Sequence, residues 1–119
     1  MADVLMLSVS GCRGVVGSSL TPQIVARFAG TIGRFLRDER PANAKAKRRP
    51  MVVVSRDGRA GGHMVRDAAR AGLLAAGCDV VDIGIAMTPS CAVSVDSLDA
   101  DAGVVLTASH NPQQWNGMK

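Results

Sequence analysis

The sequence predicts an α/β protein, a three-layer α/β/α sandwich around a four-stranded sheet that is mostly parallel or mixed. Short β-branched runs alternate with longer segments of helical periodicity along the whole chain. Glycine-rich polar turns join them, as expected where strands lead into crossover helices. The 119 residues suit one domain, and 47% hydrophobic with 20% charged residues is typical of a globular protein.

The N-terminal part contributes one strand and one helix. Residues 4–9 form a short apolar run and are predicted as the first strand, whereas residues 10–19, with three glycines, are predicted as a loop. Thr21 and Pro22 begin a helix, as N-cap and first helical residue. Its buried face is expected to carry the apolar residues at helical spacing, namely Ile24, Phe28, Ile32 and Phe35.

The centre of the chain repeats this alternation. Residues 51–55 are unbroken and β-branched, as in a strand covered on both faces. Residues 56–62 form a polar turn, and residues 63–76 form a helix rich in Ala and Leu that Gly77 ends. Residues 80–83 are the third predicted strand.

The C-terminal part completes the predicted sheet. Residues 84–89 are a turn, residues 90–97 a short helix, residues 103–107 the fourth strand and residues 108–119 a loop. Polar loops follow the first, second and fourth strands. If these strands run parallel, the three loops meet at one edge of the sheet, where such folds bind ligands.

The net charge of +4 is concentrated in one segment. Residues 37–50 contain six basic and two acidic residues, and the rest of the chain is neutral. Two prolines and the lack of apolar periodicity indicate an exposed connection over residues 38–50. We favour a solvated loop over a nucleic-acid tether, because aromatic residues for base stacking make up only 3% of the chain.

Composition excludes several further classes. No apolar run approaches the roughly 20 residues of a membrane helix. The apolar residues 4–9 are short and no basic cluster precedes them, which argues against a signal peptide. The expected compartment is therefore the cytoplasm. Three cysteines without a CxxC pair argue against a disulfide framework or a four-cysteine zinc site. Arg13 would lower the thiol pKa of its neighbour Cys12, although the favoured interpretation of Cys12 is a small residue that fills a tight turn.

The predicted loops contain groups suited to phosphate chemistry. Ser109 directly follows a buried strand, which would hold its hydroxyl rigid and exposed, as a nucleophile requires. His110 is adjacent, but no GxSxG motif or placed acid supports a Ser-His-acid hydrolase. Positive charge and flexible backbone for anion binding come from Arg13, Arg56, Arg59, Lys119, Gly11, Gly14 and Gly17.

Three motifs in order then resemble one enzyme family. Residues 107–112 read TASHNP, followed by Asn116, Gly117 and Lys119. This looks like the phosphoserine signature of the α-D-phosphohexomutases, which include phosphoglucomutases, phosphomannomutases and phosphoglucosamine mutases. Residues 10–17 resemble the family's SGxRGxxG, and residues 56–59 resemble its RDxR turn, with Gly instead of the usual Thr at the third place and Ala-Gly instead of Pro-Ser after it.

The resemblance implies a mechanism and assigns roles. Ser109 would carry a phosphoryl group, donate it to a hexose phosphate and recover the other phosphoryl from a bisphosphate intermediate. Lys119 would transfer a proton and Arg13 would stabilise the transferring charge. His110, counted with these catalytic residues, would shape the loop that carries Ser109 together with Asn111 and donate hydrogen bonds. The phosphate-binding and loop-shaping residues would be Gly14, Arg56, Arg59 and Asn111.

The resemblance also implies partners that lie outside this chain. It covers nearly all of residues 1–119 but only the phosphoserine-bearing first of four domains, incomplete at its C-terminus. Magnesium would bind through the phosphate on Ser109, with its other ligands in the missing domains, and a hexose bisphosphate would serve as activator. We therefore expect an N-terminal fragment that is inactive alone, with the sugar (glucose, mannose or glucosamine phosphate) left open.

Two other hypotheses remain. A free first domain is a non-catalytic module that binds a phosphosugar or another anion. A basic nucleic-acid binder working through residues 37–50 is less favoured, and a steep salt dependence of DNA binding would identify it.

Overall fold

A computed structural model describes residues 4–9, 11–39 and 48–119. The α/β class is confirmed, but the sheet has six strands, not four. In chain order the elements are β1 (Met6–Ser8), β2 (Gly11–Val15), α1 (Pro22–Asp38), β3 (Met51–Arg56), α2 (Gly62–Ala75), β4 (Asp79–Ile85), α3 (Thr88–Ser97), β5 (Ala102–Leu106) and β6 (Trp115–Met118).

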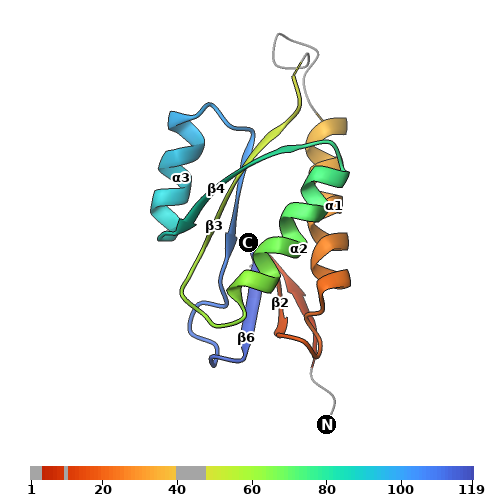
Figure 1. Cartoon of the computed structure of the whole chain (residues 1–119), viewed down its shortest axis with the longest axis vertical. Coiled ribbons are helices and arrows are strands. Elements are labelled where there is room, and N and C mark those ends of the chain that lie inside the picture. Colours follow the sequence, from red (N-terminus) through yellow and green to blue (C-terminus); the bar gives the residue numbers. More distant parts are fainter. Residues whose placement is uncertain (1–3, 10, 40–47) are drawn as a thin grey trace.

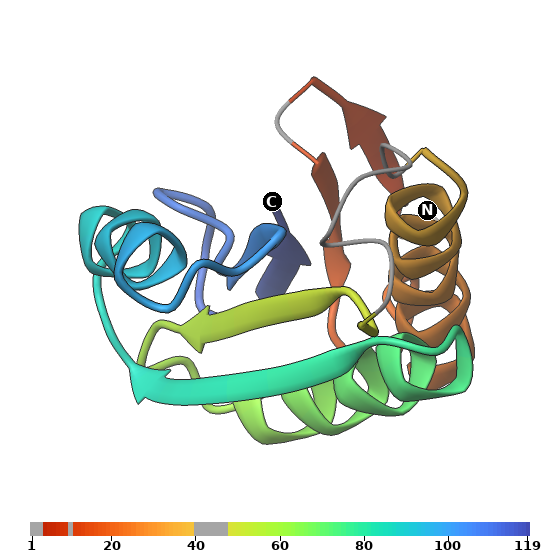
Figure 2. The same cartoon turned by 90° about the horizontal axis from the view of Figure 1, so that it is seen from above.

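The helices lie on both faces of the sheet, so the predicted three layers are present (Figures 1 and 2). Alternate residues of the central strands point to opposite faces and separate the core in two. Val52, Val54 and Leu106 pack with α1 and α2, whereas Val53 and Val105 pack with α3. Figure 2 shows α3 over the β3 and β5 half of its face, with the β1–β2 hairpin rising from the other half.

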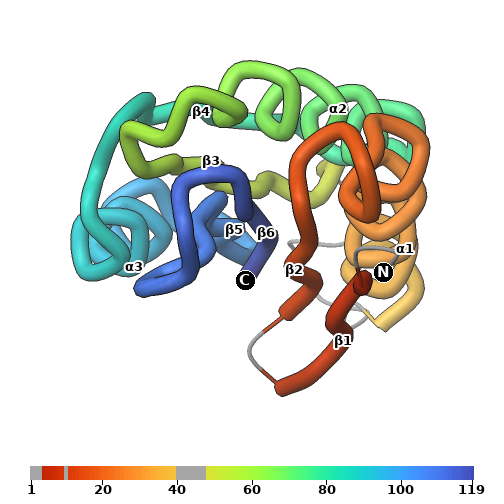
Figure 3. The backbone as a smooth tube through the Cα atoms, turned by 90° about the horizontal axis from the view of Figure 1, so that it is seen from below, coloured from red at the N-terminus to blue at the C-terminus, as the bar shows by residue number. Residues whose placement is uncertain are grey.

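The sheet is mixed, in the order β1-β2-β6-β5-β3-β4. β3 is parallel to β4 and β5, whereas β6 is antiparallel to both β5 and β2. β2 therefore runs in the same direction as β3 and β5. The segments that follow these three strands leave the sheet at the same edge, as Figure 3 shows from below.

Two segments predicted as loops are strands, and this is a correction. Residues 11–15 form β2 within the predicted loop 10–19, and residues 115–118 form β6 within the predicted loop 108–119. The two pair with each other, Cys12 opposite Met118 and Val15 opposite Trp115. A side chain at Gly11, which has φ of +101°, would collide with the carbonyl of Met118, so glycine permits this close approach.

Helix α1 begins as predicted. The hydroxyl of Thr21 accepts a hydrogen bond of 3.3 Å from the amide of Ile24, and Pro22 is the first helical residue. The predicted buried face is partly wrong, because Phe35 is 62% exposed. Small and β-branched residues form the fully buried contacts instead, which lets α1 and α2 approach closely; in α1 they are Val25, Ala29 and Gly33.

The basic segment 37–50 is only partly described, and residues 40–47 of the predicted loop lie outside the described ranges. α1 continues to Asp38. Arg48 pairs with Asp101 and Arg49 with Asp79, each at 3.2 Å. These pairs tie the end of the segment to the sheet. Within the described ranges, no helix has the length and apolar character needed to span a bilayer.

Candidate functional site

The candidate site lies where β3 and β5 end. These strands are parallel neighbours, with Arg56 opposite Leu106, so the segments that follow them leave the sheet side by side. The amide of Asp57 also donates a hydrogen bond of 3.1 Å to the carbonyl of Leu106. The predicted meeting of polar loops at one edge is confirmed for the segments after β3 and β5. It is wrong for the first predicted strand, because β1 runs antiparallel to β2 and therefore ends at the opposite edge.

Ser109 has an unusual backbone conformation. It follows the buried Ala108, its side chain is exposed, and its φ is +55°. The left-handed region costs a residue with a Cβ about 1–3 kcal/mol and persists only where surrounding contacts impose it. The amide of Ser109 donates a hydrogen bond of 3.0 Å to the hydroxyl of Thr107, and the amide of Asn111 donates one of 3.0 Å to the carbonyl of Ala108.

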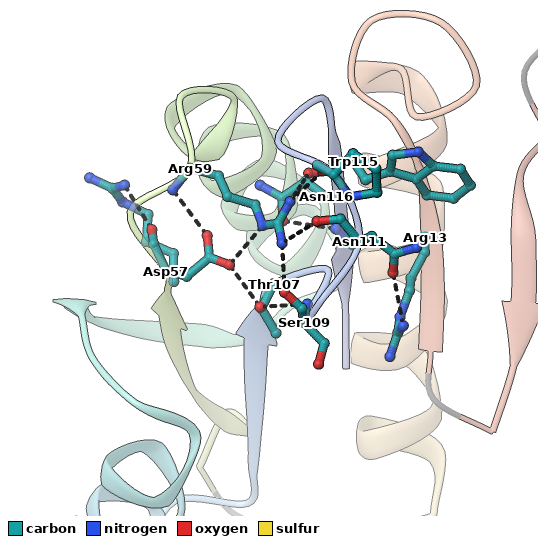
Figure 4. Close-up of polar contacts among 11 residues, drawn as sticks. Arg13, Asp57, Arg59, Thr107, Ser109, Asn111, Trp115 and Asn116 are labelled. Atoms are coloured by element: carbon teal, nitrogen blue, oxygen red, sulfur yellow. Dashed lines mark hydrogen bonds and ion pairs between the residues drawn. The ribbon is translucent and has the colours of Figure 1, made fainter.

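Arg59 holds the serine loop, defined here as residues 108–114, from within (Figure 4). Its side chain is only 9% exposed, and Nε forms an ion pair of 3.0 Å with Oδ2 of Asp57. The two terminal nitrogens donate four hydrogen bonds to backbone carbonyls, at 2.7 Å to Ser109, 2.9 Å to Asn111, 2.6 Å to Pro112 and 3.2 Å to Trp115. A guanidinium has five N–H donors, so all five are engaged.

This geometry gives Arg59 a positioning role. Phosphate binding by Arg59, expected from the resemblance, would need a free N–H group on its guanidinium. All five already have acceptors within the chain, so these contacts do not favour that role, which stays a prediction. Asp57 accepts from Nε of Arg59 and also from the hydroxyl of Thr107 at 2.7 Å. The ion pair of Asp57 is therefore with Arg59.

Arg13 reaches the serine loop from β2. Its Nη1 donates a hydrogen bond of 3.1 Å to Oδ1 of Asn111, and its Nε is buried without a partner among the described residues. Cys12 and Gly14, on either side of it, are buried, so Arg13 points to the other face of the sheet. Figure 4 shows its guanidinium beside the serine loop. The expected role of Arg13 in stabilising the transferring charge stays a prediction.

Lys119 lies level with Val105 of β5, before the strand reaches Thr107 and Ser109. It exchanges two backbone hydrogen bonds of 2.9 Å with Val105, so it is two strand residues, or about 7 Å, from Thr107 along the sheet. Directly paired residues share a face, which places Lys119 on the α3 side with Val105. Gly117 faces Arg13 directly, and Lys119 occupies the next position on that face.

A hollow of about 390 Å³ adjoins Lys119 on this side of the sheet. Its walls are one side of α3, from Thr88 to Val95, and the middle of β5, including Val105. Arg13, Lys119 and this hollow therefore belong to the same face of the molecule. The arrangement suits an anionic ligand that approaches the exposed Ser109 from that face.

The remaining predicted site residues are placed differently. Arg56 is 9% exposed and points toward α2, where its Nη1 donates to the carbonyl of Asp57 at 3.3 Å and lies 3.0 Å from the position of a Cβ on Gly62. Gly14 is a strand residue whose vacant side is filled by Ser19 and Leu20. Phosphate binding by either residue stays a prediction.

His110 is exposed, and its side chain has no hydrogen bond or ion pair with the part of the chain that the structure describes. Since no acid orients it there, the Ser-His-acid hypothesis gains no support. Asn111 shapes the loop, as expected, through its contacts with Arg13 and Arg59.

Thr107 is a residue of the site to which the sequence assigned no role. Its position two residues before Ser109 at a strand end is the signal that could have identified it, because such hydroxyls bind nearby backbone amides.

The three cysteines are buried, and burial raises the thiol pKa of Cys12 and Cys78. Cys12, Cys78 and Cys91 are all buried with free thiols. Burial raises the pKa of the Cys12 thiol, which corrects the expectation that Arg13 lowers it. Burial also raises the pKa of Cys78, against a lowering effect of Arg49. Cys12 is a core residue of β2, so it fills buried space as favoured, but in a strand and not in a tight turn.

The described residues do not form a magnesium site by themselves. They include no group of three or more His, Cys, Asp or Glu side chains placed to hold a metal ion. Asp57 is the acid nearest to Ser109 in the network, and its Oδ2 is already shared by Arg59 and Thr107. Octahedral magnesium would need further oxygen ligands from elsewhere.

Comparisons with known proteins agree on one family. A family model described as "Phosphoglucomutase/phosphomannomutase, alpha/beta/alpha domain I" matches residues 5–119. The chain is 46% identical over 109 residues to the phosphoglucosamine mutase of Leuconostoc mesenteroides. It is 42% identical over 109 residues to the phosphoglucomutase/phosphomannomutase of Thermococcus kodakarensis. Each alignment covers 92% of this chain and 23% of the relative.

Solved structures show the same relationship. A candidate phosphomannomutase from Thermus thermophilus matches with a TM-score of 0.78 and 32% identity, over 100% of this chain and 26% of that one. A phosphoglucomutase/phosphomannomutase family protein from Burkholderia thailandensis matches with a TM-score of 0.72 and 33% identity, over 96% of this chain and 26% of that one. The chain thus spans about a quarter of the length of these relatives.

Proposed function

Since this chain belongs to the phosphoglucomutase/phosphomannomutase family, whose α/β/α domain I it matches over residues 5–119, we propose that it is the phosphoserine-bearing part of a phosphohexomutase. The complete protein would interconvert hexose 1-phosphates and 6-phosphates through a bisphosphate intermediate. The chain covers 23% of its curated relatives, so the partners in this proposal are a hexose phosphate and the remaining mutase domains.

One observation carries the proposal. The hydroxyl of Ser109 is exposed, while the backbone of Ser109 is held at both its amide and its carbonyl. Phosphoryl transfer depends on positioning more than on covalent activation, so a phosphoryl carrier must be accessible and fixed. An exposed serine in an ordinary turn would satisfy only the first requirement.

The proposed chemistry exchanges one bond for another. The P–O bond to Oγ of Ser109 breaks while a sugar hydroxyl oxygen bonds to the phosphorus and loses its proton. Lys119 accepts that proton, and Arg13 stabilises the negative charge on the transferring group. His110 lines the loop beside them. The return step reverses these changes at the other phosphate of the bisphosphate.

Magnesium and a hexose bisphosphate activator belong to this proposal only for the complete protein. The described residues do not fit a magnesium site on their own, so no step here depends on the metal. A phosphate on Ser109 would add oxygen ligands, and the other ligands would come from further domains.

The sugar is left open among glucose, mannose and glucosamine phosphates. Relatives named for phosphoglucosamine and for the phosphoglucose/phosphomannose pair are similarly close, at 46% and 42% identity. The cytoplasm is the proposed compartment, which three unpaired buried cysteines support. An anion-binding module without turnover is the alternative that the following experiment separates.

A chimera tests the proposal. Residues 5–119 replace the matching segment of the phosphoglucosamine mutase of Bacillus subtilis, to which the chain is 42% identical over 112 residues. Turnover is measured with the three sugar phosphates, and mass spectrometry locates the phosphoryl group. We expect Ser109→Ala to lower turnover by orders of magnitude, whereas Ser18→Ala, an exposed turn serine, leaves it unchanged. Activity above about a tenth of the parent chimera in Ser109→Ala would contradict the proposal.

A further inference from the structure

We infer that Asp57, Arg59 and Thr107 form a clamp that sets the backbone of Ser109 in its left-handed conformation and so aims its hydroxyl for phosphoryl transfer. We call these three residues the serine clamp. The inference rests on the proposed function for its catalytic consequence, but its structural part concerns this chain alone. None of the three residues is expected to touch the transferring group; they act through Ser109.

The clamp contacts Ser109 on both sides of its Cα atom. Its amide donates to Oγ1 of Thr107 at 3.0 Å, and its carbonyl accepts from Nη2 of Arg59 at 2.7 Å. These two contacts constrain the rotations on either side of the Ser109 Cα. Its φ of +55° is a conformation that residues with a Cβ rarely adopt without such constraint.

Asp57 gives the Thr107 hydroxyl its direction. The hydroxyl donates its only hydrogen to Oδ2 of Asp57 at 2.7 Å. Its lone pairs are then left for the amide of Ser109, which is the polarity that the 3.0 Å contact needs. Without the carboxylate the hydroxyl would rotate freely, and its hydrogen would compete with the amide for the same position.

Asp57 also sets Arg59. Oδ2 of Asp57 accepts from Nε of Arg59 at 3.0 Å, and Oδ1 accepts from the Arg59 amide at 3.1 Å. The guanidinium is thereby held with both terminal nitrogens toward the serine loop. Because the side chain is 9% exposed, water competes little for these contacts. One carboxylate thus links the two groups that grip Ser109.

Loss of the serine clamp should affect the catalytic rate more than substrate binding. Effective positioning supplies a large part of the rate of phosphoryl transfer, and displacements of about 1 Å cost up to about a hundredfold. Loosening Ser109 should therefore lower kcat, while contacts that bind the sugar elsewhere keep KM nearly constant. If the three residues had a purely structural role, their substitution would lower stability without lowering kcat selectively over KM.

The structural test is made on the 119-residue chain and requires no measurement of enzymatic activity. NMR relaxation measures the backbone order parameter of Ser109 and His110 in Thr107→Val, which keeps the shape but removes the hydroxyl, and in Thr107→Ser, which keeps the hydroxyl. We expect order parameters of about 0.85 in the parent chain and in Thr107→Ser, and below about 0.6 in Thr107→Val. Thr31→Val is the matched control, because the Thr31 hydroxyl bonds the carbonyl of Arg27 at 2.9 Å, away from the site.

Unchanged order parameters in Thr107→Val would overturn the inference. If Thr107→Val does not fold, Asp57→Asn decides instead, since it retains the Thr107 hydroxyl and the volume of the acid. The same fall in order at Ser109 is expected there, and rigid Ser109 in that variant would also overturn the inference.

The catalytic test uses the chimera. We expect Thr107→Val to lower kcat by about tenfold or more with KM nearly unchanged, and Thr107→Ser to restore most of it. If Ser109→Ala retains activity, the proposed function is wrong whatever the clamp does. If Ser109→Ala is inactive while Thr107→Val keeps full kcat, the proposed function stands and the clamp is wrong.

Discussion

The guanidinium of Arg13 donates a hydrogen bond of 3.1 Å to the side-chain oxygen of Asn111, although 98 positions separate them in the chain. The contact joins β2 to the serine loop and leaves Nε of Arg13 buried without a partner in the described ranges. A buried N–H without an acceptor is costly, and we propose that a phosphoryl group on Ser109 supplies the acceptor. This relationship makes Arg13 the first residue to test.

We expect Arg13→Lys in the chimera to lower kcat by at least about tenfold, or about 1.4 kcal/mol. Lysine keeps the charge but lacks the planar fork with which, in the proposed function, Arg13 would bond a phosphoryl group while it also bonds Asn111. The melting temperature should change little. Arg27→Lys, an exposed arginine on α1, is the control and should leave kcat unchanged. A large loss of stability with normal kcat would instead make Arg13 a structural residue.

The conformation of Ser109 predicts an unusual order of stabilities. Ser109→Gly should be more stable than Ser109→Ala by about 1 kcal/mol, because glycine adopts a φ of +55° without the strain imposed by a Cβ. Ala71→Gly, at an exposed interior position of α2, should cost about 1 kcal/mol in the usual direction. Denaturant unfolding of the 119-residue chain measures both. An alanine variant as stable as the glycine variant would show that Ser109 is not strained.

Arg59→Ala should destabilise the chain by about 3 kcal/mol. The substitution removes five donated hydrogen bonds and leaves the carboxylate of Asp57 without its ion pair. Arg70→Ala, an exposed residue of α2, should change stability by less than about 0.5 kcal/mol. Urea unfolding gives both values, and a loss below about 1 kcal/mol for Arg59→Ala would mean that water replaces the arginine.

The 119-residue chain alone should neither bind magnesium tightly nor catalyse a mutase reaction. Asp57 is engaged with Arg59 and Thr107, and the described residues provide no three-member group of metal-binding side chains. Calorimetric titration with magnesium and a coupled mutase assay with a hexose bisphosphate measure the two properties. The same assay on the chain mixed with the remaining domains is the control. Clear turnover by the chain alone would show that the site is complete without them.

Local signals predicted most of the elements. The β-branched run before Arg56 and the Thr-Pro pair before α1 report local preferences of the backbone, and both elements begin within a residue of the prediction. The ordered motifs around Ser109 likewise predicted the family that the comparisons show. These features needed no knowledge of which segments meet.

β2 and β6 were missed because their own residues do not favour strands. Each is short and contains glycine, which weakens a strand through backbone entropy. They form because each completes the other's hydrogen bonds across the sheet, Arg13 opposite Gly117. Such pairing between distant segments leaves little trace in local periodicity.

The sequence by itself therefore determined the α/β class, the order of the main helices and strands, and the chemical groups near Ser109. Only the tertiary structure decided which hydrogen-bond acceptors surround Arg59 and which surround Arg13. Arg59 has the carboxylate of Asp57 and four backbone carbonyls within hydrogen-bond reach. Arg13, on the face that carries Lys119, retains an N–H without a partner among the described residues. Both are arginines in glycine-rich segments, so residue type does not distinguish them; the acceptors that folding brings to each guanidinium do.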